Sequence, residues 1–151
     1  MEISLEHIAD SSTPNTFRVA FHSATERCLV QYPSVTGLTF VDASGNKTGQ
    51  WLTRVLVSEP LDDFVLNPRD RISFDLYANI NADSQDHRWF IDLPAGMYDV
   101  HFVYRVDRET EWYDFLAKRS RFASLTPIWR GSVESNTIRF AVTDHRRENA
   151  K

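Results

Sequence analysis

Apolar and polar side chains alternate along much of this chain, and this alternation constrains the fold more than any other feature of the sequence. Across positions 17–21 and 72–76, every second residue is a Phe, Val, Ile or Leu. Successive side chains of a β-strand point to opposite faces, so this spacing is typical of strands with one buried face. The same pattern predicts strands at 2–9, 16–22, 27–32, 37–42, 50–58, 71–80, 87–92, 96–106 and 129–142.

Turn-forming residues separate the predicted strands. Pro, Gly, Asn, Asp and Ser gather at 11–15, 42–46, 67–70 and 93–96, where they supply positive φ angles or remove a backbone donor. Many short strands joined in this way are typical of an antiparallel sandwich or barrel. No internal repeat or linker divides the chain. We therefore expect one all-β domain at 1–143, followed by a flexible C-terminal tail at 144–151.

Residues 107–123 depart from the alternation. Their apolar side chains are spaced as on one face of a helix, and they are Trp112, Phe115, Leu116, Phe122 and Ala123. Acidic residues begin the segment and basic residues end it, which complements the dipole of a helix. The sequence therefore predicts a helix of about three turns, inserted before the last strand.

The charge balance and the single cysteine exclude several classes of protein. Seventeen Lys and Arg against 21 Asp and Glu give a net charge of −4, which argues against general nucleic-acid binding. Cys28 has no second cysteine for a disulfide or a CxxC redox motif. No apolar run is long enough for a membrane span, so no membrane insertion is expected. The sequence as given predicts a cytoplasmic protein, or a periplasmic or secreted one if a leader has been removed.

Candidate catalytic groups are few in the sequence. The five histidines form none of the HxH, HxxxH or HExxH patterns of metal sites, and no GxSxG turn or glycine-rich phosphate loop is present. Asp99 and His101 share one face of a predicted strand, where the carboxylate could orient the imidazole, but no nucleophile accompanies them. An enzyme is therefore the least expected function, and no cofactor is predicted.

Two acidic stretches partly match calcium-binding loops. Asp42, Ser44 and Asn46 have the spacing of the first three ligands, but no glutamate follows at the distance that such a loop needs. The second stretch consists of Asp62, Asp63, Asn67 and Asp70. We expect a hairpin turn and a charged loop here, and no metal ion. Cys28 precedes apolar residues in a predicted strand and is expected to be a buried, inert thiol.

Residues 93–100 have the form L-x-x-G-x-Y-x-apolar and open a long alternating strand. This segment resembles the tyrosine corner of immunoglobulin-like sandwiches, in which a tyrosine hydroxyl, here that of Tyr98, bonds back to the preceding turn. Three further segments resemble parts of uncharacterised bacterial immunoglobulin-like domains of the fibronectin III-like kind: the second strand, an L-x-P-G-(E/D) turn and a closing W-x-G-x-x-x-S-N strand, at 17–25, 66–70 and 129–138.

The resemblance implies a single immunoglobulin-like antiparallel β-sandwich of seven to nine strands with a helical insertion before the last strand. Arg69 replaces the glycine of the turn, and Val100 stands where an F-strand cysteine would be, so antibody-type domains are excluded. A second resemblance, to bacterial intracellular proteinase inhibitors, depends on Tyr32-Pro33, the hairpin at 40–45 and Trp51. No inhibitory loop can be identified in the sequence.

The expected function is that of a non-catalytic binding or accessory domain, which engages a protein partner by its loops or by a sheet edge. The segment 107–123 is the one long interruption of the strand pattern, and it combines aromatic and basic residues as interfaces do. Tyr113, Arg119 and Arg121 are the predicted partner-binding residues, unless the helix is only a structural lid. A carbohydrate-binding module that uses exposed aromatic rings, or a proteinase inhibitor, is the alternative function.

Overall fold

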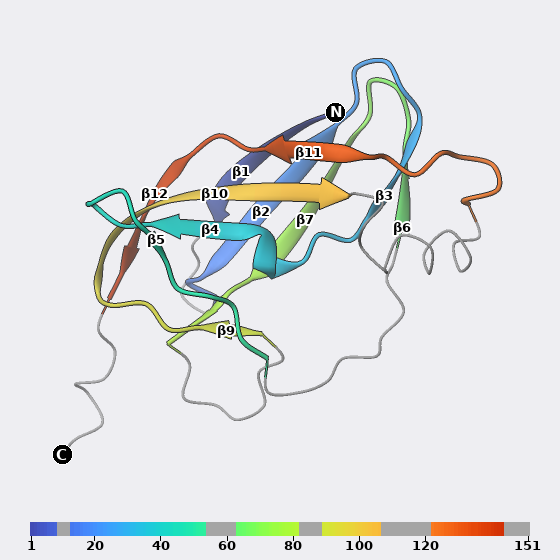
Figure 1. Ribbon diagram of the computed structural model, residues 1–151. Coiled ribbons are helices and arrows are strands. Elements are labelled where there is room, and N and C mark those ends of the chain that lie inside the picture. The colour runs from blue at the N-terminus through green and yellow to red at the C-terminus, as the bar shows by residue number, and fades with distance from the viewer. Residues whose placement is uncertain (9–12, 54–62, 82–88, 107–121, 144–151) are drawn as a thin grey trace.

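The computed structural model describes residues 1–8, 13–53, 63–81, 89–106 and 122–143 (Figure 1). These residues form a short 3-10 helix, η1 (Val35–Gly37), and twelve strands. The strands are β1 (Glu2–Ile8), β2 (Thr16–His22), β3 (Cys28–Gln31), β4 (Leu38–Val41), β5 (Lys47–Thr48), β6 (Asp63–Leu66), β7 (Arg71–Tyr77), β8 (Asn79–Ile80), β9 (Phe90–Ile91), β10 (Gly96–Val106), β11 (Gly131–Glu134) and β12 (Ile138–Val142). The described residues contain no α-helix, and the all-β class that the alternation predicts is confirmed.

The first sheet is antiparallel and has the order β1-β2-β7. Its central strand, β2, pairs with β1 and β7 along its whole length, from Thr16 to His22. Phe17, Val19 and Phe21 of this strand have no exposed surface, because the period-2 pattern turns all three toward the interior. The alternation in the sequence thus decides which face of the sheet is buried.

The second sheet is built around the long strand β10, in the order β11-β10-β4-β5, with β12 also paired to β10. The prediction of a single strand at 129–142 was wrong, because the chain leaves the ladder at 135–137 and forms two strands. At the break, Phe102 N–H donates to Ser135 Oγ at 2.9 Å, and Ser135 N–H donates to Phe102 O at 3.0 Å. The serine side chain thereby replaces a backbone acceptor, and the two strands cover successive parts of β10.

β3 and β6 pair antiparallel with each other, beside the first sheet (Figure 1). A hydrogen bond joins the connection between β2 and β3 to the connection between β6 and β7: Arg69 N–H donates to Ser23 O at 2.6 Å. Arg69 has a φ of 68°, the left-handed region that glycine favours and the position at which the resembling turn has its glycine. β6 was not predicted, because its apolar residues, Phe64 to Leu66, follow one another without alternation.

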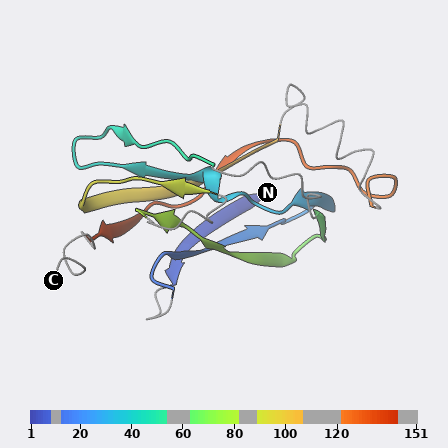
Figure 2. The same ribbon diagram turned by 90° about the horizontal axis from the view of Figure 1, so that it is seen from below.

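The two sheets form separate layers and face each other across one hydrophobic core (Figure 2). The ring of Phe17 in β2 lies 6.2 Å from that of Phe40 in β4 and 5.1 Å from that of Phe140 in β12, between ring centroids. Tyr104 of β10 is also buried, and its hydroxyl accepts Gln31 N–H at 2.9 Å. Burial raises the pKa of Tyr104, so the hydroxyl stays a neutral hydrogen-bonding group.

Three other expected elements differ from the structure or are not described. Of the predicted strand at 50–58, only residues 50–53 are described, and they contain one isolated bridge, from Leu52 to Phe90. The strand predicted at 87–92 is limited, in its described part, to β9. The predicted helix lies outside the described residues up to position 121, and Phe122 is part of a turn, its carbonyl accepting the N–H of Leu125 and Thr126. The predicted tail at 144–151 also lies outside the described residues.

Candidate functional site

The titratable side chains singled out from the sequence make structural contacts. Asp99 lies opposite Arg139 of β12, with 3.6 Å between Arg139 Nε and Asp99 Oδ1, so its carboxylate faces the neighbouring strand. His7 packs its ring against those of Phe17 and Phe140, at 5.3 Å and 4.9 Å, while its Nε2 lies 2.7 Å from a backbone oxygen. Asp99 thus links β10 to β12, and His7 links β1 to β2 and β12.

The Asp42 turn is held by its own side chain. Ser44 N–H and Asn46 N–H both donate to Asp42 Oδ1, at 2.8 Å and 2.9 Å, and these backbone bonds lower the pKa of the carboxyl group. Gly45, with a φ of 82°, completes the turn between β4 and β5. In the described part of the chain, no three His, Cys, Asp or Glu side chains are placed to share a metal ion.

Tyr98 and Cys28 are both buried, at 4% exposure. The Tyr98 hydroxyl donates to Pro94 O at 2.7 Å, which is the bond to the preceding turn that the sequence predicts. Burial raises the pKa of the Cys28 thiol, which disfavours the reactive thiolate. Both side chains therefore belong to the packed interior of the fold.

The predicted partner-binding residues Tyr113, Arg119 and Arg121 lie outside the described residues. Just after them, Phe122 and Leu125 are exposed, Leu125 at 79%.

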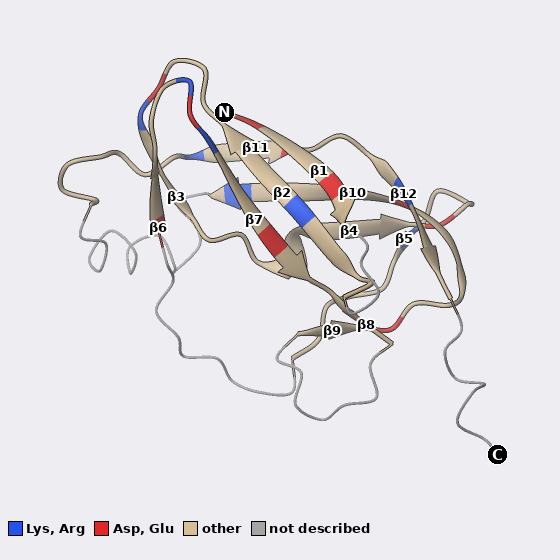
Figure 3. Cartoon of the chain, turned by 180° about the vertical axis from the view of Figure 1, so that it is seen from behind, with Lys and Arg blue, Asp and Glu red and all other residues tan. Residues whose placement is uncertain are grey.

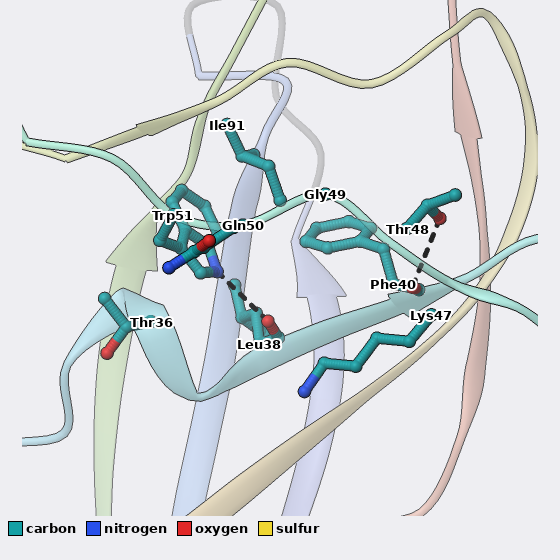
Figure 4. Close-up of a pocket in the computed structure, with 9 residues that line it drawn as sticks. All are labelled: Thr36, Leu38, Phe40, Lys47, Thr48, Gly49, Gln50, Trp51 and Ile91. Atoms are coloured by element: carbon teal, nitrogen blue, oxygen red, sulfur yellow. Dashed lines mark hydrogen bonds between the residues drawn. The ribbon is translucent and has the colours of Figure 1, made fainter.

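A pocket of about 270 Å³ lies where the chain leaves the β4–β5 hairpin (Figure 4). Trp51 is partly exposed and supplies aromatic surface beside the buried ring of Phe40, and Thr36, Lys47 and Gln50 supply polar groups. Gly49 has a φ of 78°, and a Cβ at this position would lie 2.9 Å from Ile91 Cδ1, so a larger residue would not fit. The pocket is at the small end of ligand-binding cavities and mixes aromatic with polar surface.

Side chains bind one residue on the free edge of β1 and one on that of β4. On β1, Leu5 N–H donates to Asn136 Oδ1 at 2.9 Å, and Asn136 Nδ2 donates to Leu5 O at 3.1 Å. On β4, beyond the short strand β5, Trp51 Nε1 donates to Leu38 O at 3.1 Å. A side-chain amide and an indole thus take the place of missing neighbouring strands.

Backbone groups occupy the second edge of β3. Leu29 N–H donates to Pro127 O at 2.8 Å, and Trp129 N–H donates to Leu29 O at 3.0 Å. Together with β6 on its other side, this segment leaves the middle of β3 paired on both edges. The edge of β3 is therefore not open to a further strand at this point.

The outer edge of β7 is different. Among the described residues, β7 pairs with β2 alone. Just beyond the ends of the two strands, Ala78 N–H donates to Asn15 O at 2.9 Å and Ser23 N–H donates to Asp70 O at 3.4 Å, both in the register of the β2–β7 pair. Since hydrogen-bonded pairs alternate along an antiparallel ladder, the even-numbered residues of β7 bond to β2 and the odd-numbered residues turn their backbone groups away.

The outward-facing backbone groups belong to Arg71, Ser73, Asp75 and Tyr77, and we call the first three residues the β7 edge. At this edge, the Tyr32 hydroxyl lies 3.5 Å from Asp75 O, beyond the usual length of such a hydrogen bond. A row of unpaired N–H and C=O groups is a template on which another strand can pair. The β7 edge is therefore the candidate functional site.

Acidic and basic side chains form a row across the solvent face of the first sheet, from β1 through β2 to the β7 edge. They are seen as red and blue bands on these three strands in Figure 3. Glu6, Arg18 and Asp75 are register partners across the three strands. Arg18 binds Asp75 with both ends of its guanidinium, Nε to Oδ1 at 2.7 Å and Nη2 to Oδ2 at 2.9 Å, and so lowers the pKa of that carboxyl group. The row of acidic, basic and acidic groups ends in a carboxylate at the β7 edge.

Sequence reasoning did not identify the β7 edge or the residues that occupy the other edges. Asn136 belongs to the Ser-Asn pair of the closing-strand motif, and this polar pair within an alternating segment was a usable signal for a break. Trp51 was named only in the resemblance to proteinase inhibitors, and nothing in its sequence neighbourhood indicates that its indole N–H binds a strand. Which strand lies at an edge depends on strand pairing, which the alternation does not specify.

Comparison of the chain with protein-family models, with curated proteins and with solved structures finds no match. Within the described ranges, the structure contains no helix that could cross a membrane. The function is therefore argued from the geometry of the chain's own residues.

Proposed function

We propose that this protein is a non-catalytic binding domain with an immunoglobulin-like sandwich fold of the fibronectin III-like kind, and that it binds a protein partner by adding a strand at the β7 edge. Two observations favour the fold: the strand orders β1-β2-β7 and β11-β10-β4-β5, and the position of Tyr98 at the start of the long central strand. A three-stranded sheet that faces a five-stranded sheet, with such a tyrosine, supports an antiparallel sandwich of the kind that the sequence resemblance implies.

One observation carries the binding function: the backbone groups of the β7 edge have no partner strand among the described residues, whereas side chains or backbone groups bind the outer edges at Leu5 of β1, Leu29 of β3 and Leu38 of β4. Strand addition draws its affinity from main-chain hydrogen bonds and its specificity from alternate side chains. Arg71, Ser73 and Asp75 point to the solvent face and can contact every second residue of an added strand. A protein partner with an exposed strand or an extended segment fits this edge.

Replacing Ser73 by proline should abolish partner binding while the domain stays folded. Proline removes the outward-facing N–H, and its ring occupies the place of the incoming strand, whereas the β2–β7 ladder does not use this N–H. Photo-reactive residues at Tyr77 and at Met97, exposed on β7 and on the other sheet respectively, provide the measurement. We expect cross-linking of a partner from position 77 and not from position 97, and its loss in Ser73→Pro.

Ser73→Thr is the matched control, because threonine keeps the N–H and favours a strand. It should cross-link as the parent protein does, and circular dichroism should show that both variants are folded. Undiminished cross-linking in a folded Ser73→Pro variant would contradict binding at the β7 edge.

The pocket beside Trp51 favours a second function, the binding of a small polar ligand such as a sugar. Its aromatic surface and the polar groups of Thr36, Lys47 and Gln50 are the combination that sugar sites use. Titration with a panel of simple sugars distinguishes the two functions. Sugar binding that is lost in Gln50→Ala and retained in Ser73→Pro would favour this second function.

A further inference from the structure

Three rows of side chains cross the solvent face of the first sheet at right angles to its strands. One row is Glu6–Arg18–Asp75, the middle row is Ser4–Ala20–Ser73, and the third is Glu2–His22–Arg71. The first row ends at the β7 edge in the carboxylate of Asp75, which Arg18 also binds, and the third row ends there in the guanidinium of Arg71. Small side chains lie between them.

This sequence of charges along the β7 edge is complementary to itself. When a second β7 strand is placed antiparallel, with the two Ser73 residues opposite each other, Arg71 of each chain lies opposite Asp75 of the other. All the paired residues are odd-numbered, so their outward-facing N–H and C=O groups can form hydrogen-bonded pairs in this register. Opposite charges directly across two strands stabilise their pairing.

The residues of β7 that face the core also pair favourably in this register. Ile72 of one chain lies opposite Phe74 of the other, and in the single chain Ile72 is only partly buried. Among the described residues of one chain, Arg71 has no acidic partner, and pairing places Asp75 of the second copy opposite it. The Tyr32 hydroxyl does not prevent the pairing through Asp75 O, because a carbonyl oxygen can accept two hydrogen bonds.

We propose that the occupant of the β7 edge is a second copy of this chain, in a two-fold dimer that joins the two first sheets into one continuous sheet. The proposal rests on the proposed function, since it names the partner that binds at the same edge. A two-fold contact uses the same surface on both chains, which is the commonest symmetry of protein dimers. In the dimer, the row that ends in Asp75 continues into the row of the other chain that ends in Arg71.

Sedimentation equilibrium over micromolar to millimolar concentrations tests the proposal with a charge swap. Arg71→Asp places two carboxylates opposite each other at both ends of the contact, and Asp75→Arg places two guanidinium groups there. Each variant alone should raise the dimer dissociation constant at least about tenfold. A mixture of the two variants should form a heterodimer, because the two carboxylates of one chain then face the two guanidinium groups of the other.

Glu6→Arg is the matched control, since it reverses a charge on the same face, two strands away from the edge. It should dimerise as the parent protein does, and circular dichroism should show that every variant is folded. A parent protein that stays monomeric at all concentrations would overturn the dimer, as would association that both charge variants retain. If the parent protein is monomeric while Ser73→Pro still abolishes cross-linking to a different protein, the second copy is excluded and strand addition at the edge stands.

Discussion

Replacing Phe17 by alanine should lower the free energy of unfolding by about 3–5 kcal/mol, which is the usual cost of removing a fully buried aromatic ring. Phe17 has no exposed surface, and its ring lies beside those of Phe40 and Phe140 from the opposite sheet. The variant therefore loses the contact by which β2 holds the two layers together. Urea denaturation, followed by tryptophan fluorescence, measures the change.

Met97→Ala is the control for this prediction. Met97 is 52% exposed on β10, and its truncation should change the free energy of unfolding by no more than about 0.5 kcal/mol. Equal effects in the two variants would show that the packing of the sheets does not centre on Phe17.

Replacing Asn136 by alanine should lower the free energy of unfolding by about 2 kcal/mol, because two hydrogen bonds are lost at about 1 kcal/mol each. Both bonds join the side-chain amide to the backbone of Leu5, which leaves the edge of β1 without a partner in the variant. The same urea titration measures the loss. The variant should also associate more readily at high concentration, since a second edge becomes available.

Asn136→Asp separates the two hydrogen bonds of this amide. A carboxylate still accepts from Leu5 N–H but cannot donate to Leu5 O, so this variant should be less stable than the parent protein at neutral pH. A free energy of unfolding unchanged in both variants would contradict the role of Asn136 as a substitute for a neighbouring strand.

The strands that alternate cleanly were predicted from the sequence, and the interruptions were not. β2 was found at its observed position because one face is apolar at every second residue, whereas the predicted strand at 71–80 is divided into β7 and β8. β6 was missed because Phe64 to Leu66 do not alternate, and the break between β11 and β12 was missed because Ser135 keeps the ladder bonded through its side chain. The spacing of apolar residues indicates which side chains are buried. It does not indicate which group forms a hydrogen bond with a given backbone N–H or C=O.

The sequence predicted the kind of binding site but not its position in the fold. A sheet edge was among the expected ways of binding a partner, and the Tyr98 bond followed from its motif. The choice of β7 could not be made, because an edge exists only once every pairing is known. Arg71, Ser73 and Asp75 also belong to an ordinary alternating segment, in which exposed polar residues are expected whether or not they bind anything.

Amide hydrogen exchange along β7 tests the open edge most directly. The Arg71→Asp variant is suited to the measurement, since it should be monomeric at the concentrations that NMR needs. If the edge is open, the amides of Ser73 and Asp75 exchange rapidly, whereas those of Phe74 and Leu76, which bond to β2, are strongly protected. Protection of Ser73 and Asp75 equal to that of Phe74 in the monomer would show that the edge is already occupied, and would contradict binding at this site.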